Sequence, residues 1–257
     1  MTRSLAFATD VALRIAEGAV LERGTSTVVR MPANPGFRWG NFLLVPEAGD
    51  PVVRAAEHRA AFPGAGFVTV GVDAAHPVLD EGAWLSAGFE VERLAVLTSH
   101  GPVAAGSTGV RPLASDADWA AVTALALALE DAPEAAHVAF TRQRTAEQRR
   151  AVAAGSAVWL GVEIDGVIVA TAGIADADDG VVRFQDVQTA AEHRRHGYAS
   201  ALIAAGVRVA VDRFGSALFV LVADRSGPAI GLYRRLGFAE VETQLQLTRI
   251  DRVTGGT

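Results

Sequence analysis

The stretch VVRFQDVQTAAEHRRHGYASALIAAGV runs from Val181 to Val207 and predicts a strand, a basic loop and a helix. The strand is expected to end at Thr189, and small or apolar residues at helical spacing begin just after Gly197. Free backbone N–H groups at the start of such a helix bind phosphate well. The helix dipole repels the two arginines of the loop by about 0.3 to 1 kcal/mol each unless an anion lies nearby. The stretch therefore predicts a phosphate-binding loop.

The rest of the second half predicts an α/β domain. Helices are expected over 119–129, 142–154, 199–215 and before Gly237, and strands over 110–113, 157–164, 167–174, 181–189, 217–223 and 241–248. The dipeptide Asp165-Gly166 predicts a two-residue hairpin turn. This order of elements indicates a mixed sheet with flanking helices.

Two motifs in this half resemble those of the GNAT N-acetyltransferase superfamily. Val187-x-Thr189-x-x-x-x-Arg194-x-x-Gly197-x-Ala199 resembles the family's acetyl-CoA motif, and Ala229-x-x-Leu232-Tyr233-x-x-Leu236-Gly237-Phe238 resembles its second signature. Either motif alone is weak, but both in this order are specific, and they cover 110 to about 250. The resemblance implies the GNAT fold, which is a mixed, mostly antiparallel sheet flanked by helices, with acetyl-CoA as the acyl donor.

The resemblance also implies where acetyl-CoA binds. Pantetheine would lie in a gap between the strand that ends at Thr189 and the strand over 217–223, and the loop would hold the pyrophosphate. The backbone N–H of Val187 would polarise the thioester carbonyl, a contribution of about 3 to 4 kcal/mol where single donors have been removed. Ser226 stands where the family often has asparagine, and its reach is shorter. The expected cofactor-binding residues are Val187, Thr189, Arg194, Arg195, His196, Gly197, Tyr198, Ala199, Ser200 and Ser226.

Two residues are the candidate catalytic groups. By the resemblance, Tyr233 protonates the departing CoA thiolate, although its spacing from Ala229 also fits an aromatic residue of the core. An attacking amine must lose a proton, so a base is needed. Asp186 is our candidate for the base, and the alternatives are Glu130, Asp131 and His137.

The first half resembles a truncated, degenerate copy of the second. Gly88 and Gly237 lie 149 residues apart, and each separates a short helix from a strand. At this spacing Arg194 falls on Val45, Gly197 on Ala48, Ala199 on Asp50 and Tyr233 on Trp84. Carboxylates and prolines would then face the pyrophosphate, so a second catalytic centre is not expected. With a small-residue linker over 100–109, the predicted domains are a degenerate GNAT-like domain over 1–105 and a catalytic GNAT domain over 106–257.

A turn-rich aromatic segment stands out in the first half. It runs from Asn34 to Phe42 with the sequence NPGFRWGNF. We expect a structural turn closed by its aromatic side chains. The alternative is that Phe37, Arg38 and Trp39 line the substrate cleft.

Composition limits the partners and the compartment. The net charge is −6 and the pI is about 5.5, which argues against general binding of nucleic acid or anionic membranes. The absence of cysteine excludes disulfides and thiolate metal sites, and the six histidines lack metal-ligand spacing, so no metal is expected. No apolar run reaches the length of a membrane span. We therefore expect a cytoplasmic protein that acts as a monomer or homodimer.

These observations lead to one functional hypothesis and two alternatives. We expect an N-acyltransferase that moves an acetyl group from acetyl-CoA to a primary amine of a small molecule or peptide, by direct attack on the thioester. The first alternative is a non-catalytic CoA-binding or regulatory pseudo-acetyltransferase. The second is a protein-interaction module, for which the sequence offers no positive feature.

Overall fold

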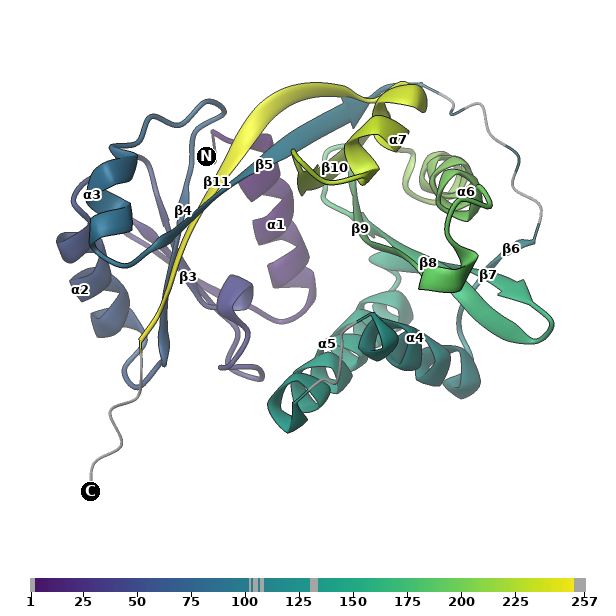
Figure 1. Cartoon of the computed structure of the whole chain (residues 1–257), viewed down its shortest axis with the longest axis horizontal. Coiled ribbons are helices and arrows are strands. Elements are labelled where there is room, and N and C mark those ends of the chain that lie inside the picture. Colours follow the sequence, from purple (N-terminus) through teal and green to yellow (C-terminus); the bar gives the residue numbers. More distant parts are fainter. Residues whose placement is uncertain (1–2, 102, 104–105, 107–108, 130–133, 252–257) are drawn as a thin grey trace. The chain divides into compact units, whose positions relative to one another are not determined.

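The computed structural model describes residues 3–101, 103, 106, 109–129 and 134–251 (Figure 1). Its internal contacts divide the chain into two compact units. Unit 1 comprises residues 1–96, 223–227 and 241–257, and unit 2 comprises residues 97–222 and 228–240. The end of the chain is thus grouped with unit 1, whereas the predicted domain boundary at 105/106 assigned it to the second domain; that boundary remains a prediction.

Unit 1 is a sheet with three helices. Its strands follow the order β1-β2-β3-β4-β11-β5. The elements are α1 (Leu5–Ala16), β1 (Val20–Arg23), β2 (Thr27–Arg30), η1 (Arg38–Gly40), β3 (Phe42–Val45), α2 (Pro51–Ala61), β4 (Phe67–Val72), α3 (Glu81–Ser86), β5 (Glu90–Ser99) and β11 (Ala239–Ile250). In Figure 1 the yellow strand β11 lies next to β4. The two strands pair antiparallel from Leu245 opposite Val72 to Ile250 opposite Phe67.

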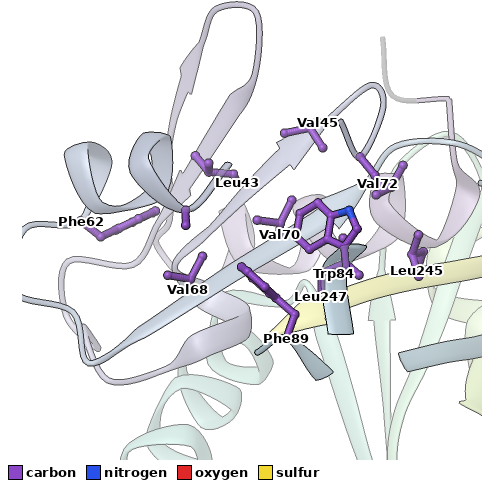
Figure 2. Close-up of a cluster of buried hydrophobic side chains, with 12 residues drawn as sticks. Leu43, Val45, Phe62, Val68, Val70, Val72, Trp84, Phe89, Leu245 and Leu247 are labelled. Carbon is purple, nitrogen blue, oxygen red and sulfur yellow. The ribbon is translucent and has the colours of Figure 1, made fainter. Parts of the chain in front are cut away.

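The core of unit 1 explains why the last strand belongs there. All six residues of β4 are buried, as expected for an apolar strand covered on both faces. Figure 2 shows Leu245 and Leu247 of β11 among the buried side chains around Trp84, and both are fully buried. Full burial of one leucine contributes about 1.5 to 3 kcal/mol, so β11 is an integral part of this core.

The described residues of unit 2 form a sheet flanked by four helices. Its strands follow the order β10-β9-β8-β7-β6, antiparallel from β6 to β9 and parallel between β9 and β10. The elements are β6 (Val110–Pro112), α4 (Asp116–Ala128), α5 (Ala135–Ala154), β7 (Ala157–Ile164), β8 (Val167–Asp176), β9 (Val181–Thr189), η2 (Ala191–His193), α6 (Tyr198–Phe214), β10 (Leu218–Asp224) and α7 (Ala229–Arg235).

Local sequence explains several of these elements. Ser115 caps α4 in a capping box with Asp118. Asp165 and Gly166 both have positive φ, 49° and 80°, as the predicted tight hairpin requires. Helix α5 begins at Ala135, seven residues earlier than predicted. The packing of α6 on the sheet depends on Gly206, because a Cβ there would lie 2.4 Å from the Phe184 ring.

Candidate active site

Strand β9 contains a bulge at the predicted catalytic position. Gln188 lies opposite Thr171 and Gln185 lies opposite Gly173, so two residues of β9 face one residue of β8. The two residues are Asp186 and Val187, and Asp186 has a φ of 48°. A bulge of this kind bends the strand locally, and the pairing with β8 resumes beyond it at Gln188 and Thr189.

The same strand separates from its other neighbour. Within the described residues, the parallel register between β9 and β10 covers only three residue pairs, from Val181–Leu218 to Arg183–Val220. Backbone groups of β9 beyond Arg183 therefore lack a strand partner on this side. Such an open edge can pair with an extended ligand in the manner of an added strand.

The loop after β9 leaves the start of α6 open. Arg195 and Gly197 have positive φ, 68° and 84°, and Gly197 is the N-cap of α6, without a side-chain cap. The first backbone bond of the helix runs from the N–H of Ala201 to the carbonyl of Gly197, 3.0 Å. The N–H groups before Ala201 are the donors that a helix cannot satisfy internally. Nδ1 of His196 lies 2.9 Å from the carbonyl oxygen of Arg194 and fixes the turn.

A pocket of about 680 Å³ lies between this loop and α7. Eight of the ten predicted cofactor-binding residues line it: Val187, Thr189, Arg194, Arg195, Gly197, Tyr198, Ala199 and Ser200. Among the described residues, three guanidinium groups line the pocket and no carboxylate does, although the chain is acidic overall. The pocket is therefore suited to an anion with an extended apolar part.

Two predicted cofactor-binding residues lie outside the lining. The ring of His196 stacks on Tyr198 with centroids 5.8 Å apart, so it contacts a lining residue. Ser226 donates its hydroxyl to Oδ1 of Asp224, 2.8 Å, in the segment that is grouped with unit 1. Both remain predictions as cofactor contacts.

The pocket also includes residues that sequence reasoning did not assign to the site. They are Leu129, Gln188, His193, Pro228, Ala229, Leu232 and Arg235. Ala229 and Leu232 belong to the second motif quoted above, so the sequence did contain a signal that these two residues lie near the site. Arg235 and Leu129 had no signal, because their position depends on how α7 and the end of α4 approach the loop.

Tyr233 is buried on α7 and does not line the pocket. Its ring lies 6.5 Å from that of Phe238. Burial raises the pKa of the Tyr233 phenol to about 12, because the charged form would lose its hydration. The phenol is thus protonated at any working pH.

Asp186 is exposed and held by α5. Its Oδ2 accepts a hydrogen bond of 2.6 Å from Nε2 of Gln148. Of the alternative bases, His137 lies 3.3 Å from the hydroxyl of Thr141, whereas Glu130 and Asp131 lie outside the described residues.

The Asn34–Phe42 segment forms a tight structural turn in unit 1. The amide of Asn41 donates to the carbonyls of Asn34 and Phe37, 2.9 Å each, and its oxygen accepts from the backbone N–H of Met31, 3.0 Å. Trp39 packs on Phe42 at 5.5 Å. The expected structural turn is thus present, and a role for Phe37, Arg38 and Trp39 in a substrate cleft remains a prediction.

Two features of the described residues concern metal binding and membrane spans. No group of three or more histidine and acidic side chains there is arranged to hold a metal ion. In the same residues, every helix is too short or too polar to cross a bilayer.

Comparison with known proteins identifies the class. Residues 121–238 match the model of the acetyltransferase (GNAT) family, so the chain carries a GNAT acetyltransferase-family domain. No curated protein matches the chain.

Solved structures extend the likeness over nearly the whole chain. A GCN5-related N-acetyltransferase from Kribbella flavida has 23% identity and a TM-score of 0.64, with 98% of each chain covered. A tandem GNAT protein from the clavulanic acid biosynthesis pathway has 15% identity and a TM-score of 0.57, covering 96% of this chain and 88% of that one. A functionally unknown conserved protein from Staphylococcus epidermidis has 14% identity and a TM-score of 0.70, covering 91% and 94%. The predicted GNAT fold in a tandem arrangement is confirmed.

Proposed function

We propose that this chain transfers an acetyl group from acetyl-CoA to a primary amine of a small molecule or peptide. The observation that carries the proposal is the start of α6, where uncapped N–H groups and two arginines face a pocket that no carboxylate of the described part of the chain lines. This arrangement favours a diphosphate, because backbone donors, the helix dipole and guanidinium groups act in the same direction.

The residues present fit the two parts of the donor. The loop and the first turn of α6, from Arg194 to Ser200, would hold the diphosphate. The open edge of β9 beyond Arg183 would hold the pantetheine arm through the backbone of Val187 and Thr189. Acetyl-CoA supplies a thioester whose carbonyl carbon is open to attack by an amine.

The chain's own groups would then act around that carbonyl. The bulge at Asp186 and Val187 frees backbone groups from the ladder, and the N–H of Val187 would stabilise negative charge on the carbonyl oxygen. Asp186, held by Gln148, would take the proton from the amine directly or through water. Tyr233 would return a proton to the leaving sulfur.

A non-catalytic CoA-binding protein is the second candidate, and the position of Tyr233 favours it. The phenol is buried, does not line the pocket, and has a pKa of about 12. Against a thiol pKa of about 8.5, such an acid donates its proton uphill. Both candidate functions therefore use the same pocket, and they differ in whether the bound acetyl-CoA is turned over.

Two measurements separate the candidates. Calorimetric titration with acetyl-CoA and with CoA tests the pocket, and absence of binding to both would refute both candidates. Release of free thiol from acetyl-CoA over a panel of amines then tests turnover. Acetylated product, identified by mass spectrometry, supports the enzyme, and tight binding without thiol release supports the binding protein.

A further inference from the structure

The pocket of unit 2 has more positive charge than its phosphate loop supplies. Arg194 and Arg195 come from the loop, but a third guanidinium comes from Arg235 at the end of α7. The net charge of the chain is −6, so three cations around one pocket form a local anion site.

Arg235 lies on the face of α7 that forms the pocket wall. Ala229, Leu232 and Arg235 follow at three-residue spacing, and all three line the pocket. The side chain extends back along the helix, because a Cβ on Gly231 would lie 3.5 Å from Nη1 of Arg235. Among the described residues, no ion pair or hydrogen bond engages this guanidinium.

The neighbouring Arg234 provides a matched contrast. Its Nη2 lies 3.1 Å from a carboxylate oxygen of Glu240, and Arg234 does not line the pocket. These two adjacent, exposed arginines of one short helix therefore differ in their ion pairing and in their position relative to the pocket. One is paired with a carboxylate, and the other is available to an anion in the pocket.

Coenzyme A has phosphate in two separate places, the diphosphate and the 3′-phosphate of the ribose. The N–H groups of α6 and the two loop arginines all belong to the loop and the first turn of α6, and together they would bind one diphosphate. Arg235 belongs to another element and can meet a second phosphate without competing for the first. A guanidinium is also well suited to phosphate, because its planar fork donates two hydrogen bonds.

We propose that Arg235 binds the 3′-phosphate of the donor and so makes the pocket selective for CoA over 3′-dephospho-CoA. The inference rests on the proposed function, since it takes a CoA thioester as the donor. It assigns a specificity-determining contact to a residue outside the phosphate loop.

The test is a titration of two ligands against three proteins. Wild type, Arg235→Gln and the control Arg234→Gln are titrated calorimetrically with CoA and with 3′-dephospho-CoA. We expect wild type to bind CoA about tenfold more tightly than dephospho-CoA, the scale of one charge-assisted hydrogen bond at an exposed site. Arg235→Gln should lose this preference by weakening CoA alone, and Arg234→Gln should retain it.

The outcomes separate this inference from the proposed function. If wild type binds both ligands equally, or if Arg235→Gln weakens both to the same degree, Arg235 does not contact the 3′-phosphate, while the donor site stands. If wild type binds neither ligand, the proposed function falls as well. Arg235→Lys should keep part of the preference, because it retains the charge and loses the planar fork.

Discussion

Helices α2 and α6 occupy corresponding places in the two units, yet their first turns differ in chemistry. The first N–H groups of α2 are bound by its own N-cap, since Oδ1 of Asp50 accepts from Val52 and Val53 at 2.8 and 3.0 Å. Helix α6 begins at Gly197 without any side-chain cap. A helix that is capped by its own carboxylate has fewer free donors and carries negative charge where a phosphate would bind. Of these two helices, α6 is therefore the one suited to an anionic ligand.

The loops and strands before these helices differ in the same sense. Arg54 closes the loop before α2 by donating to the carbonyls of Ala48 and Glu47, 3.0 Å each. Strand β3 pairs with β4 up to its last residue, Val45, whose carbonyl also accepts from the N–H of Asp73 at 2.7 Å. Strand β9 also pairs with β10 over three residues, but it continues beyond Arg183 to Thr189 without a partner on β10 in the described residues. In unit 1, the Arg54 side chain and the β3–β4 pairing therefore occupy the region that stays open in unit 2.

The largest effect should come from reversing the charge at the open helix start. We expect the double substitution Arg194→Glu and Arg195→Glu to weaken acetyl-CoA binding by at least roughly 100-fold, because two charge-assisted contacts become repulsive. The measurement is calorimetric affinity. The control is Arg150→Glu with Arg208→Glu, which changes the net charge equally at two exposed residues outside the pocket. If the double variant bound acetyl-CoA with an affinity within threefold of wild type, the assignment of the phosphate site to this loop would be wrong.

A buried histidine should make unit 1 sensitive to acid. His58 of α2 is fully buried, and burial lowers the pKa of its imidazole to about 4. Because the unfolded chain binds the proton more readily, the free energy of unfolding is intact above pH 6.5 and falls as the pH drops towards 4. The full loss is about 3 kcal/mol. The substitution His58→Val introduces the residue found 149 positions later, Val207, and should abolish this part of the pH dependence. Urea unfolding at pH 7 and pH 4.5 measures it, and equal pH dependence in both proteins would contradict the assignment.

Removing the phenol of Tyr233 tests the contrast with its counterpart Trp84, which is fully buried in the core of unit 1. We expect Tyr233→Phe to lower kcat about 100-fold, with little change in the KM for acetyl-CoA, as for loss of a general acid. Since burial raises the pKa of this phenol to about 12, wild type should show no loss of rate from its ionisation up to pH 10. A kcat within twofold of wild type would give Tyr233 a packing role only.

The smallest effect should come from removing the cap of α2. Asp50→Ala leaves the N–H groups of Val52 and Val53 without their carboxylate, and we expect the free energy of unfolding to fall by about 1 kcal/mol. Binding of acetyl-CoA should not change, because the site belongs to α6. If the variant instead bound a second equivalent of acetyl-CoA, the Asp50 cap would be the feature that prevents unit 1 from binding this ligand.

The sequence by itself determined the parts of the site that are local. The strand, the basic loop and the start of α6 follow one another in the chain, so periodicity and the glycine position predicted them together. Ten residues of that stretch line the pocket, and eight of them were predicted to bind the cofactor. The hairpin turn was also predictable from the sequence, because it depends on two adjacent residues, Asp165 and Gly166. The length of α5 was not predicted, because its first turns show no clear apolar periodicity.

Only the tertiary structure decided which distant elements meet. The apolar pattern of β11 shows that it is a strand but not which strand it pairs with, and the structure pairs it with β4 in the core of unit 1. The bulge at Asp186, the short pairing of β9 with β10, and the place of Arg235 on the pocket wall likewise depend on neighbours far apart in the chain. The physical reason is that a two-residue repeat fixes the faces of a strand and leaves its edges unspecified.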